Sequence, residues 1–279
     1  MRRKLVVGNW KLNGSLVKNE VLMSDMLKRM NGMKAADYAL CVPYTYLFQA
    51  QRLLMGSNIL WGAQNVSQYE DGAYTSSISA HMIADFDCSF AIIGHSERRA
   101  LSNESNQKAA KRFARVVSAG ITPIYCVGET LQEREAGLAE NVVKNQILAI
   151  TYGLDDSIFE QAKRVNTVIA YEPVWAIGNG KTASPQQAQD MHAFIRDLIA
   201  NLDVEFSKKV RIIYGGSMTP ANAADLMAMP DIDGGLIGRC SLLPDEFSHI
   251  CNEASISRHQ GMSLVSRSDM SCTKLAAIN

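Results

Sequence analysis

The stretch VRIIYGGSMTPANAADLMAMPDIDGGLIGR, residues 210–239, contains the repeating unit from which the fold is predicted. It begins with a short apolar run, Val210–Tyr214, and continues through a Gly-Gly turn into a helical pattern over Asn222–Met227. A second apolar run follows at Gly235–Ile237. The runs mostly lack polar alternation, which is typical of strands buried on both faces. Two such strands joined through a helix predict a parallel sheet.

The same unit recurs along almost the whole chain. The other predicted strands are Leu5–Val7, Ala39–Val42, Ile59–Ala63, Phe90–Ile93, Thr122–Val127 and Val168–Tyr171. The other predicted helices include Lys18–Met30, Asn106–Ala119, Asn141–Tyr152 and Gln186–Asn201. Eight strand–helix units within about 250 residues are enough to close into a barrel without edge strands. The alternative is an open, doubly wound sheet, but no GxGxxG motif follows the first strand. We therefore predict the α/β class, with a single-domain (β/α)8 barrel.

Several helix ends carry recognisable signals. Ser184 is a predicted N-cap, with Pro185 at the first helical position and Gln187 three residues after the cap. Thr219-Pro220 repeats this device before Asn222–Met227, and Gly120 is the predicted C-terminal glycine of the helix ending at Ala119. These signals place the helices between the predicted strands.

Composition restricts the classes of protein that fit. The 279 residues are 47% hydrophobic, and 28 Lys+Arg balance 28 Asp+Glu, which gives no electrostatic footprint for nucleic acid or a membrane surface. No apolar stretch is long enough for a membrane span, and the basic start at Met1 has too short an apolar run for a signal peptide. The six cysteines form no CxxC pair, which favours a reducing compartment and no metal site. We expect a cytoplasmic protein that binds neither nucleic acid nor membranes.

The end of the chain has a different character. Residues 1–250 are predicted to form the catalytic barrel domain, and residues 251–279 a C-terminal extension that is poorly ordered. The extension is serine-rich and has no sustained hydrophobic period. The alternative is a short helix docked on the barrel, because Ser271–Ile278 is long enough for one or two turns.

Polar residues gather at the points where the predicted strands end. In parallel barrels, the catalytic residues lie at the C-terminal ends of the strands. There the chain carries Asn9-Trp10-Lys11, Gly94–Arg99, Cys126–Thr130, Glu172–Lys181, Gly215-Gly216-Ser217 and Gly238-Arg239. Taken singly, each has an ordinary structural interpretation: a surface lysine, a turn-capping histidine, packing tryptophans or a tight glycine turn. Their occurrence at the same end of separate strands favours a catalytic site.

The segment Pro173–Ala183 is longer than most loops between strands and helices. Pro173 restricts Glu172 to extended backbone angles, which would hold the carboxylate still. A glycine-rich centre between stiffer ends suits a lid that closes as a unit. The alternative is a static connection.

Five of these motifs together resemble the triosephosphate isomerase family. They are Asn9-Trp10-Lys11, Gly94-His95-Ser96-Glu97-Arg98-Arg99, Cys126-Val127-Gly128-Glu129-Thr130, Tyr171-Glu172-Pro173-Val174-Trp175-Ala176-Ile177-Gly178 and Tyr214-Gly215-Gly216-Ser217. The resemblance runs from about Leu5 to about Pro244. It implies a TIM barrel that interconverts dihydroxyacetone phosphate and D-glyceraldehyde 3-phosphate through an enediolate. It also implies that the enzyme uses neither a metal nor an organic cofactor.

The resemblance also implies a role for each matching residue. Glu172 would be the base, His95 the electrophile, and Lys11 the cation that stabilises the enediolate. Substrate would be bound by Asn9, Trp10, Lys11, Gly178, Ser217, Gly238 and Arg239. Cys126 and Glu97 would support these groups from behind, although Cys126 is equally well explained as a small buried residue.

The resemblance further implies a homodimer, in which the loop Gln64–Ser77 reaches the neighbouring subunit through Tyr74 and Thr75. The alternative is a monomer with a mobile surface loop. The chain departs from the family pattern at three points. Ser76-Ser77 stands where the family often has Gly-Glu, Asn179 where threonine is common, and Arg239-Cys240 where Gly-Ala is usual. If Arg239 needed a positive φ, it would cost about 1–2 kcal/mol. Otherwise its amide is kept and its guanidinium is available to the phosphate.

Two other functions remain open at this stage. One is a phosphosugar aldolase with Lys11 as a Schiff base, but nothing around Lys11 in the sequence indicates the burial or second cation that such a lysine needs. The other is a barrel that has lost turnover and serves as a binding or scaffold protein. The intact set of Lys11, His95 and Glu172 argues against it.

Overall fold

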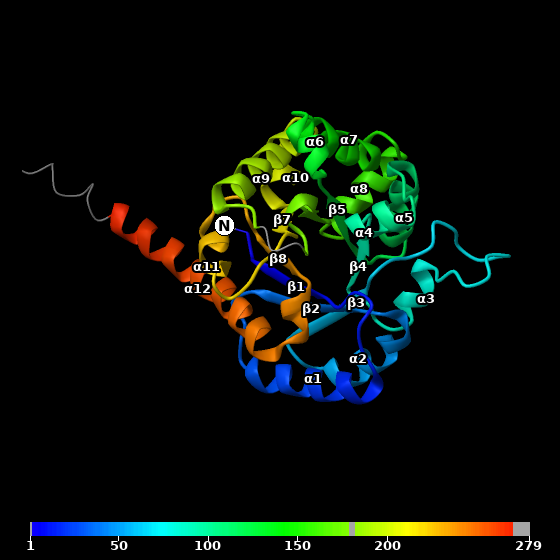
Figure 1. The fold of residues 1–279 in the computed structure, drawn as a ribbon, viewed down its shortest axis with the longest axis horizontal. Helices are drawn as coiled ribbons and strands as arrows, with labels where there is room; N and C mark the ends of the chain where they lie inside the picture. The colour runs from blue at the N-terminus through cyan, green and yellow to red at the C-terminus, as the bar shows by residue number, and fades with distance from the viewer. Residues whose placement is uncertain (1, 179–181, 270–279) are drawn as a thin grey trace, which may run out of the picture.

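The strands of the barrel follow one another around it in sequence order. The computed structural model describes residues 2–178 and 182–269. Its eight parallel strands close into a barrel with helices around it (Figure 1). The strands are β1 (Leu5–Asn9), β2 (Asp37–Val42), β3 (Ile59–Ala63), β4 (Phe90–Ile93), β5 (Thr122–Val127), β6 (Val168–Tyr171), β7 (Arg211–Tyr214) and β8 (Gly234–Ile237). The predicted (β/α)8 TIM barrel is confirmed.

Helices and short 3-10 turns connect the strands. The α-helices are α1 (Leu16–Arg29), α2 (Leu47–Leu54), α3 (Ala80–Ala84), α4 (Ser96–Leu101), α5 (Asn106–Ser118), α6 (Leu131–Glu135), α7 (Ala139–Thr151), α8 (Asp156–Arg164), α9 (Pro185–Ala200), α10 (Val204–Lys209), α11 (Ala223–Ala228) and α12 (Pro244–Asp269). The 3-10 turns are η1 (Tyr44–Tyr46), η2 (Val174–Ala176) and η3 (Arg239–Leu242).

The strands are buried on both faces along most of their length, as their composition predicts; Leu60 in β3 is an exposed exception. Along β1, Leu5 and Val7 point into the barrel, whereas Val6 packs against the surrounding helices. The barrel closes where β8 meets β1. A Cβ on Gly234 would lie 1.8 Å from the carbonyl oxygen of Leu5, and its φ is +139°, so only glycine fits this closure.

The helix signals are confirmed at two of three places. Ser184 caps α9 in a capping box with Gln187, with Pro185 in the first turn, and Gly120 follows α5 with a φ of +74°. The prediction that Thr219 caps the next helix is wrong. Asn222 is the N-cap of α11, and its side chain accepts the Thr219 amide at 2.8 Å. The Asn222 side chain thus orders the turn before the helix rather than the helix itself.

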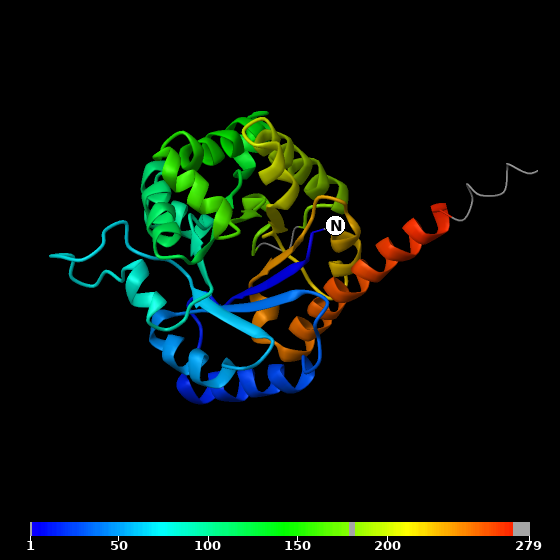
Figure 2. The same cartoon turned by 180° about the vertical axis from the view of Figure 1, so that it is seen from behind.

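The segment between β3 and α3 projects from the body of the molecule in both views (Figures 1 and 2). The rings of Tyr69 and Tyr74 stack within it at 3.8 Å. Ser77 donates its amide to the carbonyl of Tyr74, and Ser76 between them has a φ of +72°. This is a tight turn whose third residue is usually glycine or asparagine.

Helix α12 passes through the predicted domain boundary between residues 250 and 251. Cys251 and Ala254 are fully buried in the main core, and Tyr38 and Ser255 share a hydrogen bond of 2.7 Å. The C-terminal part of α12 extends away from the barrel (Figure 2). Poor order in the extension stays a prediction, and Ser271–Ile278 lies outside the described residues.

Candidate active site

A cavity of about 590 Å³ opens at the C-terminal ends of the strands. Most of the residues predicted to act in catalysis and binding line it: Asn9, Lys11, His95, Glu172, Gly178, Ser217, Gly238 and Arg239. Trp10 is the exception, because its side chain is fully buried in the core and it is not among the described residues that line the cavity. The strand ends thus bring together groups that lie more than 200 residues apart in the sequence.

Glu172 follows the last residue of β6 and is 2% exposed. Its carboxylate accepts the backbone amide of Ser96 at 2.8 Å and the Ser96 hydroxyl at 3.2 Å. Two glycines make space for it. A Cβ on Gly128 would lie 1.8 Å from the Glu172 carbonyl oxygen, and one on Gly215 would lie 2.8 Å from Glu172 Cγ. Neither position can hold a larger residue without moving Glu172.

His95 precedes α4 and points its Nε2 at Glu172 Oε1, at 2.9 Å. Its Nδ1 accepts the backbone amide of Glu97 at 3.2 Å. A neutral ring with its proton on Nε2 satisfies both contacts, because a second proton on Nδ1 would break the bond from Glu97. His95 therefore presents a hydrogen-bond donor to the cavity.

Burial and charge act in opposite directions on this pair. Burial raises the pKa of Glu172, but His95 and the hydrogen bonds from Ser96 more than offset it, so that pKa is lowered. Burial lowers the pKa of His95, and the Glu172 carboxylate raises it by more. The rise depends on a charged Glu172 in contact with the ring. It is lost once Glu172 takes up a proton or moves away.

Lys11 has a φ of +52°, which costs a non-glycine residue about 1–2 kcal/mol. The strained backbone is held from two sides: Lys11 donates its amide to Asn9 Oδ1 at 3.1 Å, and Gln64 donates to its carbonyl at 3.0 Å. Lys11 Nζ forms an ion pair of 2.5 Å with Glu97. Lys11 lines the cavity, and Gly238 lies beside the end of its side chain.

The loop after β8 departs from the family pattern without backbone strain. The non-glycine residues with positive φ in the described part of the chain do not include Arg239. Arg239 begins η3, its side chain is exposed, and it lines the cavity. Of the two alternatives left open by the sequence, the one with an unstrained Arg239 is correct.

The first residues of the predicted lid are held by contacts of Trp175 with Glu129 and Arg134. Trp175 donates its indole N–H to Glu129 Oε1 at 2.8 Å, and the guanidinium of Arg134 lies 4.9 Å from its ring. Tyr171 donates to the same Glu129 oxygen at 3.1 Å. The middle of the lid, including Asn179, lies outside the described residues, so its closure stays a prediction.

Some residues that line the cavity were not predicted as site residues. Ile177, Thr219 and Pro220 appear in the sequence analysis only within a motif or a helix signal, and the others are Met218, Ala221, Leu236 and Glu246. Glu246 is in the first turn of α12, where an acidic residue is an ordinary helix-start feature. Nothing in its sequence context marks it as part of the site. Ser96 was quoted within a motif, but its two bonds to Glu172 follow only from the folded structure.

Among the described residues, no three or more His, Cys, Asp or Glu side chains are grouped to hold a metal ion. No helix in residues 2–178 and 182–269 is long and apolar enough to cross a membrane. The thiol of Cys126 is fully buried next to the site, and burial raises its pKa well above the usual range. The groups that line the cavity include a carboxylate, an imidazole and an ammonium, from Glu172, His95 and Lys11.

A buried carboxylate and an imidazole donor, in contact at one cavity, are suited to moving protons to and from a bound molecule. With the closed parallel barrel, they define the class of the protein: a (β/α)8-barrel enzyme equipped for acid–base chemistry. Comparison with known proteins narrows this class. The model of the family "Triosephosphate isomerase" matches residues 4–254.

Three relatives that carry the name triosephosphate isomerase cover almost the same part of the chain. The protein from Thiobacillus denitrificans is 51% identical over 91% of this chain and 100% of its own length. Those from Nitrosomonas eutropha and Nitrosococcus oceani are 48% and 49% identical, over 90% and 91% of this chain and 97% and 100% of their own lengths. The chain belongs to the triosephosphate isomerase family, a family of aldose–ketose isomerases.

Proposed function

We propose that this protein interconverts dihydroxyacetone phosphate and D-glyceraldehyde 3-phosphate through an enediolate. The observation that carries the proposal is the contact of 2.9 Å between Glu172 and His95 Nε2, both buried at one cavity. The Glu172–His95 contact would open when substrate binds, so that the substrate meets the base on one side and a neutral hydrogen-bond donor on the other. Its phosphate would reach the loops after β7 and β8.

Glu172 removes the proton from the carbon beside the carbonyl. The electron pair of that C–H bond moves onto the carbonyl oxygen, which His95 Nε2–H stabilises by a hydrogen bond. His95 then relays protons between the two oxygens, and Glu172 returns its proton to the neighbouring carbon. Lys11 stabilises the negative charge because its ammonium lies at the mouth of the same cavity. The Ser96 bonds hold Glu172 in the free enzyme and must break for it to reach substrate.

The phosphate is held by Gly178, Ser217, Gly238 and Arg239. Backbone amides at these positions would donate to its oxygens, and Arg239 adds a positive charge that most members of the family would lack there. Asn9 supports Lys11, and Trp10 supports the site from within the core rather than by touching substrate. Binding energy from the phosphate would help to keep water from the enediolate.

The rival aldolase mechanism fits this geometry less well. Lys11 Nζ is paired with Glu97, which favours charge stabilisation over attack as a free amine. A barrel without turnover also fits less well, because a scaffold has no physical need for a buried base that faces an imidazole.

A coupled assay of glyceraldehyde 3-phosphate isomerisation tests the proposal. The Glu172→Asp variant withdraws the carboxylate by roughly 1 Å, so we expect fast wild-type turnover and about a 100-fold loss in the variant. No wild-type turnover would refute the proposal. Borohydride treatment with substrate should leave Lys11 unmodified, whereas covalent labelling would favour the aldolase.

We also propose that the protein is a cytoplasmic homodimer. Large apolar side chains are exposed on and near the loops that would meet a second copy: Leu12, Leu16, Phe48, Tyr74, Met82 and Leu101. Thr75 follows Tyr74 on the projecting segment. The five cysteines in the described part of the chain carry free thiols, which fits a reducing compartment. Sedimentation equilibrium should give a mass of two chains, and a single chain would refute the dimer.

Residues 1–250 are proposed as the catalytic domain, and the part of the 251–279 extension beyond Ser255 is proposed to be dispensable for activity. Because Cys251, Ala254 and Ser255 pack on the barrel, truncation after residue 256 is the sharper test. We expect unchanged activity and thermal midpoint. A large loss of either would mean that the extension docks on the enzyme.

A further inference from the structure

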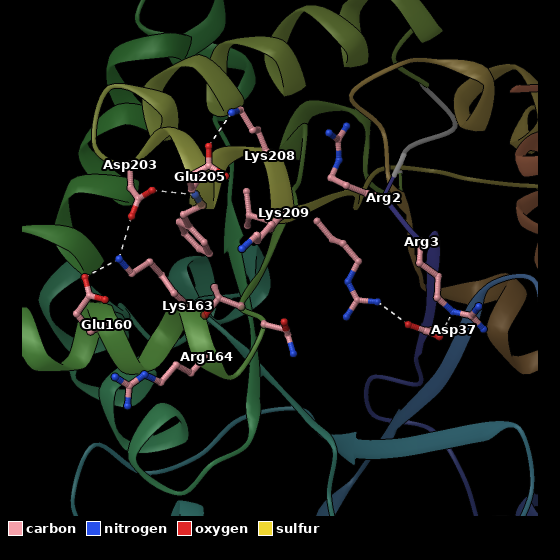
Figure 3. Close-up of a pocket in the computed structure, with 15 residues that line it drawn as sticks. Arg2, Arg3, Asp37, Glu160, Lys163, Arg164, Asp203, Glu205, Lys208 and Lys209 are labelled. Atoms are coloured by element: carbon pink, nitrogen blue, oxygen red, sulfur yellow. Dashed lines mark hydrogen bonds and ion pairs between the residues drawn. The ribbon is translucent and has the colours of Figure 1, made fainter. Parts of the chain in front are cut away.

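A second cavity, of about 790 Å³, lies at the opposite end of the barrel from the candidate active site (Figure 3). Asp37 and Arg211, which begin β2 and β7, lie on its wall, together with Arg2 and Arg3 just before β1. The other wall comes from the end of α8 and from α10. We call it the N-terminal cavity. Its size is in the range of small-molecule sites.

The N-terminal cavity concentrates positive charge on a chain that is neutral overall. Seven basic side chains line it: Arg2, Arg3, Lys163, Arg164, Lys208, Lys209 and Arg211. Only four carboxylates do so: Asp37, Glu160, Asp203 and Glu205. Ion pairs within the fold neutralise part of this positive charge. The ion-pair partners of each cation therefore show how much positive charge remains unneutralised.

One wall of the cavity has more cations than its carboxylate can neutralise. Asp37 is shared between Arg3, at 2.5 Å, and Arg211, at 2.8 Å. Lys209, at the end of α10 on the facing wall, forms no ion pair with any described residue. Arg2 differs, because Asp233 lies 2.8 Å from its Nε and neutralises it from outside the cavity. A single carboxylate of the cavity, Asp37, is therefore shared by two guanidinium groups, those of Arg3 and Arg211.

The other wall, from α8 and α10, carries two paired and two unpaired cations in the described part of the chain. Lys163 lies between Glu160, at 2.5 Å, and Asp203, at 2.9 Å, and Lys208 pairs with Glu205 at 2.7 Å. Arg164 stands apart from these pairs and has no ion-pair partner among the described residues. The ion pairs account for every carboxylate in the cavity and leave Arg164 and Lys209 without an ion-pair partner in residues 2–178 and 182–269. Both stand in the last turn of their helices, where a basic residue is favourable, but neither is neutralised by a described carboxylate.

We propose that the N-terminal cavity is a second binding site, for a small molecule that carries a phosphate group. Guanidinium groups and a lysine ammonium around one cavity provide several charge-assisted donors for phosphate oxygens. Phe206 and Val210 also line the cavity and offer apolar contact to the rest of such a molecule. A nucleic acid fits less well, since the surplus charge is confined to one cavity on a neutral chain.

Calorimetric titration of inorganic pyrophosphate into the full-length protein, at low ionic strength, tests this site. The Arg164→Gln/Lys209→Gln variant removes two positive charges without breaking an ion pair, so its thermal midpoint should not change. We expect one binding event of the wild type to weaken at least about tenfold in this variant. The isomerase KM and kcat should not change, because neither residue lines the cavity at the other end. Weaker pyrophosphate binding with unchanged KM and kcat would distinguish the second site from the proposed active site.

The matched control is Lys108→Gln/Lys144→Gln, which removes the same charge from exposed positions on α5 and α7. It should bind pyrophosphate as the wild type does. Equal binding by the wild type and the Arg164→Gln/Lys209→Gln variant would overturn the proposal. Equal weakening in the control would also overturn it, because overall charge would then explain the effect.

Discussion

Replacing Gly215 with alanine places a methyl group against the proposed base. The new Cβ would lie 2.8 Å from Glu172 Cγ and 3.2 Å from the carbonyl oxygen of Tyr171. The φ of Gly215 is not positive, so alanine adopts this backbone without strain. The substitution therefore acts on the position of Glu172 rather than on the turn itself.

The size of the effect follows from these distances. Non-bonded carbon atoms prefer about 3.5 Å or more, so Glu172 must retreat by roughly 0.7 Å. A misplacement of about 1 Å costs about 100-fold in rate, so we expect kcat to fall by roughly 10- to 100-fold. The loops that hold the phosphate keep their backbone, so KM should change little.

Steady-state kinetics in both directions of the isomerisation, with thermal unfolding alongside, measure this effect. Glu172→Asp is the companion variant, because it moves the same carboxylate by shortening its side chain. If Gly215→Ala folds normally and keeps kcat within about twofold of the wild type, the contact with Glu172 does not control catalysis and the reasoning is wrong.

Three further predictions concern other parts of the barrel. Arg239→Ala should raise KM about fivefold with kcat nearly unchanged, because it removes about 1 kcal/mol of phosphate binding; an unchanged KM in steady-state assays would contradict this. Ser76→Gly should stabilise the fold by up to about 1 kcal/mol in chemical unfolding, since glycine accepts the φ of +72° that serine resists, and destabilisation would argue against strain in this turn. Burial lowers the pKa of His192 to about 3, so stability should fall as pH drops below 6.5, by about 2 kcal/mol at pH 5. His192→Asn keeps a donor for the carbonyl of Asp231 and should flatten this dependence in unfolding experiments; an unchanged pH slope would refute the assignment.

The strands could be predicted because a parallel sheet covered on both faces leaves an unmistakable apolar run in the sequence. The predicted and observed strands agree closely, and β3 to β6 have the predicted bounds. The start of α11 could not be predicted in the same way. Thr219 and Asn222 are both residue types that commonly cap helices. In the folded chain Asn222 is the N-cap of α11, and its side chain donates to the carbonyl of Ser217.

Catalytic candidates were predictable because barrel topology gathers strand ends at one mouth. Asn9, Lys11, His95 and Glu172 stand at the ends of three different strands, β1, β4 and β6, and line one cavity. Trp10 stands between Asn9 and Lys11 in the same motif, but its side chain is buried in the core. Successive residues at the end of a strand point in different directions. Sequence position alone does not distinguish a residue that touches the cavity from one that supports it.

The sequence by itself determined the repeating strand–helix unit, the barrel and the group of residues that carry the chemistry. Those features depend on local hydrophobic patterns and on motifs within a few residues. Only the tertiary structure decided which contacts these residues make: the Ser96 bonds to Glu172, the space left by Gly215, the position of Glu246, and the N-terminal cavity. Each of these joins segments far apart in the chain. Their distances are set by how the closed barrel packs, which no local pattern records.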